Sequence, residues 1–179
     1  GICAAGHKAM YHDAWGGMPR TSLLKKLDPD LVPLAQRFTH EPVSSEHKAG
    51  DLTADVAKKV GLPAGLPVAV GAFDAHHGAV GAGCKPGTLV KIMGTSTCDI
   101  TVWPLDEDLP DIPGLCGIVP GSVVSGMYGL EAGQSAVGDI FNWFVKHLAP
   151  AEYAADGDTH VNLSKAADEL TPGASGLLA

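Results

Sequence analysis

The high content of glycine and proline is the sequence feature that most constrains how this chain can fold. They number 23 and 13 of its 179 residues and follow no collagen-like period. Glycine permits backbone conformations with positive φ, and proline ends helices and central strands, so this composition predicts short elements joined by tight turns. Hydrophobic residues still make up 45% of the chain, which supplies enough apolar surface for a core and excludes extensive disorder.

Charge and cysteine usage narrow the class of protein. The chain has 12 Lys and Arg against 20 Asp and Glu, a formal net charge of −8, which argues against nucleic acid and anionic membranes as partners. The longest nearly uncharged stretch, residues 61–73, contains two prolines and is too short to span a bilayer. The four cysteines form no CxxC pair, which favours reduced thiols in a soluble cytoplasmic protein.

The hydrophobic pattern predicts alternating helices and strands, and hence an α/β fold. Helices are expected at residues 22–38 as one or two short core-facing helices, 53–60, 75–83, 132–148 and 163–170. Strands are expected at residues 67–73, 88–93, 98–103 and once or twice between 117 and 130. Thr53 is a candidate cap and Gly61 a candidate stop for the second helix. The three tryptophans, Trp15, Trp103 and Trp143, are expected in the core.

Asp74 directly follows the apolar run 67–73, which is predicted to be a buried strand. Open α/β sheets place ligands beyond the carboxyl ends of their strands, so Asp74 is a candidate reactive group. The alternative is a structural role as a helix N-cap, which aspartate fills equally well at such a boundary.

The predicted hairpin between residues 88 and 103 turns at Gly94-Thr95-Ser96-Thr97. Backbone N–H groups around a glycine, together with three hydroxyls, can hold phosphate oxygens without a basic side chain. A hairpin also needs small turn residues for its own geometry, so the turn alone does not identify a phosphate site.

Isolated polar residues suggest two further kinds of site. His7, His12 beside Asp13, and the pair His76 and His77 are candidates for a zinc or manganese site. No HExxH spacing is present and adjacent histidines point in different directions, so most are expected to be structural and no metal ligand is assigned. Lys8 and Glu131 each stand in an uncharged segment, so burial would require a polar ligand or each other as a partner. The alternative is that both side chains point to solvent.

Taken in order, these segments resemble the FGGY family of carbohydrate kinases. The resemblance covers essentially the whole chain and rests on Gly50-Asp51-Leu52-Thr53, Gly61-Leu62-Pro63, the run 67–74, Gly94-Thr95-Ser96 and Pro172-Gly173-Ala174-Ser175-Gly176-Leu177. The members that phosphorylate L-ribulose are the most similar, through Gly6-His7-Lys8-Ala9-Met10, the segment 73–76, the turn 94–98, and the segments 129–136 and 141–144.

The resemblance implies an actin-like, ribonuclease-H-like sugar kinase fold that is incomplete in this chain. Residues 1–74 would end the sugar-side N-terminal domain, and residues 75–179 would begin the nucleotide-side C-terminal domain. The implied reaction is ATP- and Mg²⁺-dependent phosphorylation of the terminal hydroxyl of a ketopentose, most closely L-ribulose to L-ribulose 5-phosphate in arabinose catabolism. A homodimer of the full-length enzyme is compatible with the sequence, which does not determine the assembly.

The resemblance also assigns roles to individual residues. Asp74 matches the catalytic base that accepts the proton of the sugar hydroxyl, and Lys8 and Glu131 match contacts to the sugar. Gly94 and Thr95 match the hairpin that holds the ATP phosphates, and Gly133 matches a glycine at the start of a helix near the nucleotide.

Two motifs of the family are absent from this sequence: the first phosphate hairpin, Asp-x-Gly-Thr, and the glycine-rich adenosine motif. The chain is therefore expected to be an internal fragment that is inactive alone. Two other functions remain open from the residues: a non-catalytic nucleotide-sensing module of the same superfold, and a metal-dependent hydrolase built on His7, His76 and His77.

Overall fold

The computed structural model describes residues 1–176, which form two compact units. The first contains Gly1–Ile92 and Thr97–Gln134, and the second contains Met93–Ser96 and the residues from Ser135 onward. Residue 74, the expected domain boundary, lies inside the first unit. Leu177, the last residue of the family-like segment 172–177, lies outside the described residues.

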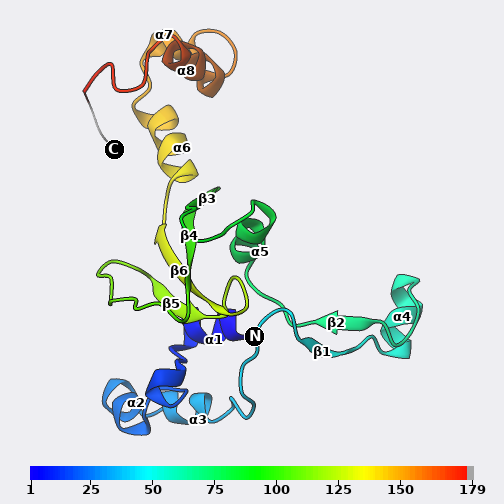
Figure 1. Cartoon of the computed structure of the whole chain (residues 1–179). Coiled ribbons are helices and arrows are strands. Elements are labelled where there is room, and N and C mark those ends of the chain that lie inside the picture. The colour runs from blue at the N-terminus through cyan, green and yellow to red at the C-terminus, as the bar shows by residue number, and fades with distance from the viewer. Residues whose placement is uncertain (177–179) are drawn as a thin grey trace. The chain divides into compact units, whose positions relative to one another are not determined.

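A four-stranded antiparallel sheet organises the first unit, with strand order β3-β4-β6-β5 (Figure 1). Its strands are β3 (Val90–Met93), β4 (Thr97–Pro104), β5 (Gly117–Pro120) and β6 (Met127–Gln134). The register of β4 and β6 runs without interruption from Thr97 opposite Gln134 to Pro104 opposite Met127. The predicted hairpin and the strands after residue 117 are therefore confirmed.

Helix α5 (Asp74–Gly81) covers one face of this sheet and closes the core. Its Ala75 and Ala79 are buried with Ile100 and Val102, which alternate on β4 as a strand with one covered face requires. A Cβ atom at Gly78 would lie 3.2 Å from Cδ1 of Ile92, so the small residues of α5 allow its close approach. The helix predicted at residues 75–83 is thus confirmed and held by tertiary contacts.

Helix α1 (Ile2–Ala9) packs against β5. Gly6 makes this possible, because a Cβ atom there would collide with the side chain of Val119 on β5. The helix ends at Met10, which has a left-handed φ of 56°. A 3-10 turn, η1 (Asp13–Trp15), follows.

A two-stranded ribbon carries helix α4 (Ala54–Val60), which ends at Gly61 as predicted. Thr53 occupies the N-cap position, but its side chain makes no capping hydrogen bond. Strands β1 (Lys48–Asp51) and β2 (Pro67–Ala69) form this ribbon. The prediction of a buried strand over residues 67–73 is wrong, because β2 is only three residues long and exposed. It pairs with β1 in a separate ribbon instead of joining the main sheet.

Helices α2 (Thr21–Leu27) and α3 (Leu31–Ala35) confirm the prediction for residues 22–38 but not its core-facing orientation. The two helices contact chiefly each other. Only Leu24 of their large apolar side chains is buried, and most of the others are exposed. Trp15 and Trp143 are also more than half exposed, and Trp103 is 37% exposed, so the expectation of buried tryptophans is wrong for the described residues.

The second unit contains α6 (Gly138–His147), α7 (Ala151–Ala154) and α8 (Thr159–Asp168). The helix expected from residue 132 begins six residues later, because residues 132–134 continue strand β6. Helix α8 begins earlier than expected, where Asp158 Oδ1 accepts hydrogen bonds from the backbone of His160 and Val161. Apolar side chains of α6 and α8 line an open groove of about 670 Å³. Within residues 1–176, no helix combines the length and apolar character that crossing a membrane requires.

Candidate functional site

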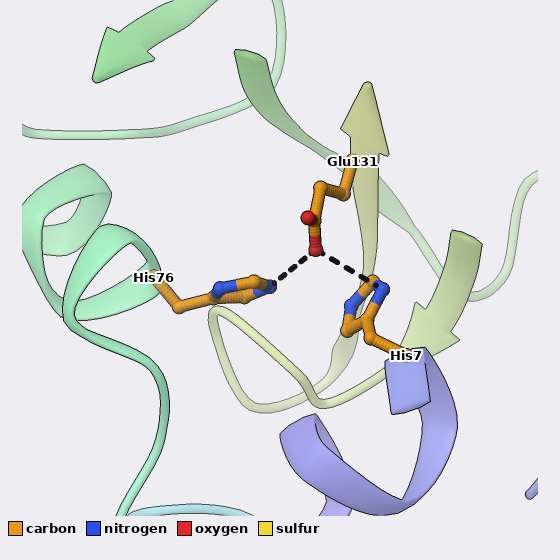
Figure 2. A group of neighbouring side chains, drawn as sticks. All are labelled: His7, His76 and Glu131. Atoms are coloured by element: carbon orange, nitrogen blue, oxygen red, sulfur yellow. Dashed lines mark ion pairs between the residues drawn. The ribbon is translucent and has the colours of Figure 1, made fainter. Parts of the chain in front are cut away.

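Three side chains from separate elements of the first unit meet in its interior: His7 on α1, His76 on α5 and Glu131 on β6 (Figure 2). Glu131 Oε2 lies 3.3 Å from His7 Nδ1 and 3.5 Å from His76 Nε2. The exposed fractions of these side chains are only 1%, 2% and 8% for His7, His76 and Glu131. The arrangement therefore places two imidazoles around one carboxylate oxygen out of contact with bulk water.

Local backbone geometry leaves room for the His7 ring. Gly117 on β5 pairs with Glu131 on β6, and a Cβ atom at Gly117 would lie 2.6 Å from His7 Nδ1. On the other side of the ring, Nε2 lies 3.1 Å from the hydroxyl of Ser122. A glycine on one strand and a serine on a following loop thus fix the position of His7.

The hydrogen bonds of Ser122 indicate which nitrogen of His7 carries the proton. The Ser122 hydroxyl has one proton and lies 3.1 Å from both the carbonyl oxygen of Val119 and His7 Nε2. When it donates to Val119, His7 Nε2 donates to Ser122 Oγ. Burial, with His76 and Lys8 nearby, lowers the pKa of His7 to about 4, so the ring is neutral near pH 7. In this tautomer the Nδ1 lone pair faces the carboxylate of Glu131.

Several polar atoms in this cluster lack hydrogen bonds. Among the described residues, His7 Nδ1, both ring nitrogens of His76 and Glu131 Oε2 are buried with no hydrogen-bond partner. Burial also lowers the pKa of His76, although the charge of Glu131 opposes this effect. Unpartnered buried polar groups are costly, so the cluster is suited to a cation or to the hydroxyl groups of a ligand.

Two of the predicted sugar contacts, Asp74 and Glu131, lie next to His76. Asp74 begins the helix that carries His76, and Glu131 Oε2 is 3.5 Å from His76 Nε2. Lys8 is exposed, with its Nζ atom 5.4 Å from the centroid of the Phe73 ring. Asp74 is also exposed, and its Oδ1 accepts a hydrogen bond of 2.8 Å from the backbone of Ala75. Lys8 therefore points to solvent, whereas Glu131 is buried beside histidines.

The structure brings together two of the three histidines of the hydrolase hypothesis. His76 joins His7, but His77 is exposed and its Nε2 accepts a hydrogen bond from the backbone of Ala72 at 3.2 Å. The third member is Glu131, whose isolation among uncharged residues was the signal in the sequence. Its pairing with two histidines depends on strand register and could not be read from spacing.

The predicted phosphate turn lies in the second unit with the start of α6. The backbone N–H of Gly138 donates to the carbonyl of Gly94 at 3.1 Å, and that of Val137 donates to the carbonyl of Thr95 at 2.8 Å. Gly133 was expected at the start of a helix, but it lies in β6 opposite Cys98. Gly138 takes the position at the helix start.

Comparisons with known proteins agree on one family. The sequence model described as the C-terminal domain of the FGGY family of carbohydrate kinases matches residues 89–178. Over 96% of its length the chain is 44% identical to a ribulokinase of Vibrio parahaemolyticus, and over 99% it is 42% identical to a ribulokinase of Halalkalibacterium halodurans. It spans about a third of these relatives, 31% and 32% of their lengths.

A solved structure shares the fold. The crystal structure of a xylulose kinase from Rhodospirillum rubrum superposes with a TM-score of 0.60 at 31% sequence identity. The match covers 84% of this chain and 30% of the xylulose kinase chain. This similarity fits the expected actin-like α/β fold, of which the chain forms a part.

Proposed function

Because this chain belongs to the FGGY family of carbohydrate kinases, we propose that it is part of an enzyme that transfers the γ-phosphoryl group of ATP to a ketopentose. The favoured substrate is L-ribulose, converted to L-ribulose 5-phosphate in arabinose catabolism. The observation that carries the proposal is the similarity of nearly the whole chain to proteins named ribulokinase. The contact of Glu131 with His76, which follows Asp74 on the same helix, supports it.

The first unit would bind the sugar. Asp74 is the proposed catalytic base, and its exposure leaves the carboxylate accessible to a sugar hydroxyl. Phosphoryl transfer has a loose transition state, so this base acts mainly by orienting the hydroxyl and accepting its proton. Lys8 would donate hydrogen bonds to other hydroxyls, whereas Glu131 would accept them.

The turn of the second unit would bind the ATP phosphates. Gly94 and Thr95 are tied to the start of α6, whose N-terminal end carries positive partial charge that favours an anion. The absence of a side chain at Gly138 allows this contact, because a Cβ atom there would lie 2.7 Å from the Gly94 carbonyl oxygen. Gly133 stays a predicted phosphate contact, now placed on a strand.

Mg²⁺ would accompany ATP, but the described residues offer it no fitting site. Mg²⁺ prefers an octahedral shell of oxygen atoms, whereas the cluster of possible metal ligands contains two imidazoles. The Asp-x-Gly-Thr motif expected to help hold Mg²⁺ is absent from the sequence. We therefore assign no Mg²⁺ ligand here, and we expect the 179-residue chain to be inactive alone.

The domain boundary, the cellular location and the oligomeric state are also part of the proposal. A boundary near Asp74 would separate a sugar-side segment, 1–74, from a nucleotide-side segment, 75–179. A cytoplasmic location agrees with the absence of disulfides among the described residues, all four cysteines being free thiols. A homodimer of the full-length kinase stays a prediction that light scattering can test.

A hybrid enzyme provides the test. The 179 residues would replace the matching stretch of the Vibrio parahaemolyticus ribulokinase, and ribulose-dependent formation of ADP would be measured with MgATP. We expect turnover with L-ribulose and none from the 179-residue chain alone. A hybrid that retains the parent's melting temperature but phosphorylates no ketopentose would overturn the proposal.

A further inference from the structure

We propose that His7 Nδ1, His76 Nε2 and Glu131 Oε2 form a binding site for a divalent transition-metal ion of the zinc class. The inference does not depend on the proposed kinase function, because it rests on the buried cluster of the first unit alone. It also differs from the hydrolase considered from the sequence, which required His77.

The spacing of the three ligand atoms fits such an ion. Zinc in a tetrahedral site lies roughly 2.0 to 2.2 Å from nitrogen and oxygen, which places neighbouring ligand atoms roughly 3.3 to 3.6 Å apart. Glu131 Oε2 is 3.3 Å from His7 Nδ1 and 3.5 Å from His76 Nε2. One ligand atom from each residue lies within 4.8 Å of the others, so all three can face one ion.

The lack of hydrogen-bond partners for the cluster within the described part of the chain favours the binding of a cation. The three ligand atoms are buried and have no hydrogen-bond partner among residues 1–176. His7 Nδ1 and a carboxylate oxygen of Glu131 face each other at 3.3 Å, and in the tautomer with the proton on Nε2 their lone pairs repel unless a positive charge lies between them. A metal ion would supply that charge and satisfy all three atoms.

The contact of His7 with Ser122 is typical of a histidine that binds a metal ion. A ligating histidine usually donates its other ring N–H to a neighbouring oxygen, and His7 Nε2 does so to Ser122 Oγ at 3.1 Å. Two imidazoles and one carboxylate select zinc-class metals over Mg²⁺ or Ca²⁺, and three protein ligands leave a fourth position open. Because Glu131 is also a proposed sugar contact, bound metal would compete with the sugar.

The test measures metal binding by the 179-residue chain without sugar or nucleotide. After treatment with a chelator, the chain is titrated with Zn²⁺ against a chromophoric chelator, and one equivalent is expected to bind. His7→Gln, His76→Gln and Glu131→Gln should each weaken binding by at least about 10-fold. His77→Gln, the exposed neighbour on α5, is the matched control and should bind zinc like the unmodified chain.

A second measurement on the unmodified chain avoids any effect of the substitutions on folding. Added Zn²⁺ should shift the ring NMR signals of His7 and His76 and leave those of His12 and His77 unchanged. Co²⁺ should give the intense visible absorption of a four-coordinate site. Zinc that binds without shifting His7 and His76, or no stoichiometric binding, would overturn the proposal. A failed kinase assay would leave these readouts unaffected.

Discussion

The backbone N–H of Gly138 lies 3.1 Å from the carbonyl oxygen of Gly94, to which it donates a hydrogen bond. This contact joins the first residue of α6 to the turn that follows β3. It requires a glycine, because a Cβ atom at residue 138 would come within 2.7 Å of the same oxygen. The turn and the helix start are therefore fixed to each other by backbone atoms.

Replacing Gly138 with Ala should separate α6 from the turn. Because the obstructing atom is a backbone oxygen, relief requires a backbone shift, with an expected loss of roughly 1 to 3 kcal/mol in the free energy of unfolding. Urea denaturation measures this loss. Gly81→Ala is the control, since a Cβ atom there meets nothing within 4 Å and alanine is the better helix former. Equal stability of the two variants would contradict the prediction.

Replacing Gly117 with Ala should displace the His7 ring from Glu131. The new Cβ atom would lie 2.6 Å from His7 Nδ1, and the movement should weaken zinc binding by about 10-fold or more. Competition with a chromophoric chelator measures the change. Gly71→Ala adds a methyl group in open space and should leave the affinity unchanged. Unaltered affinity in Gly117→Ala would mean that His7 is not a ligand.

The low pKa of His7 predicts a loss of stability in acid. Burial holds the pKa near 4 in the folded chain against 6.5 ordinarily, so between these values the unfolded state binds the extra proton. The His7 contribution is fully present above pH 6.5 and declines as the pH falls toward 4. The expected loss between pH 7 and 4.5 is roughly 2 to 3 kcal/mol.

This loss is measured as the difference between the unmodified chain and His7→Gln, both free of metal, in urea denaturation at the two pH values. Other titrating groups contribute nearly equally to both proteins and largely cancel. Parallel stability curves for the two proteins would show that the pKa of His7 is close to its ordinary value.

Asp74→Asn in the ribulokinase hybrid should lower kcat by about 10³-fold or more, because the amide cannot accept the hydroxyl proton. Glu131→Gln should chiefly raise the KM for ribulose, since it alters a proposed sugar contact. Steady-state assays with varied ribulose separate the two effects. Asp55→Asn, on exposed α4, is the control. A hybrid with Asn at position 74 and normal kcat would remove Asp74 from the role of base.

The sequence predicted local structure better than the position of each element in the fold. The hairpin around residues 94–97, the small-residue helix α5 and the end of α4 at Gly61 followed from turn and helix signals that act over a few residues. Burial was less predictable, because an apolar run such as 67–73 does not reveal whether its strand joins a central sheet or an exposed ribbon.

For the candidate site too, the sequence predicts individual residues better than their contacts in the fold. Isolated charge, position and family resemblance predict Lys8, Asp74 and Glu131 as site residues, and this stays a prediction. The pairing of Glu131 with His7 depends on β5–β6 register and on the space left by Gly117, which only the folded chain defines. The shift of the α6 start to Gly138 also depends on tertiary structure, because β6 extends through residues 132–134, which had been expected to belong to the helix.

The groove between α6 and α8 has a practical consequence for handling the chain. Phe141 and Phe144 are 63% and 40% exposed along this groove, so it presents apolar surface to solvent although the chain carries a net negative charge. Kosmotropic salts raise the cost of that contact. The purified chain should therefore precipitate at a low ammonium sulfate concentration and adsorb readily to air–water interfaces.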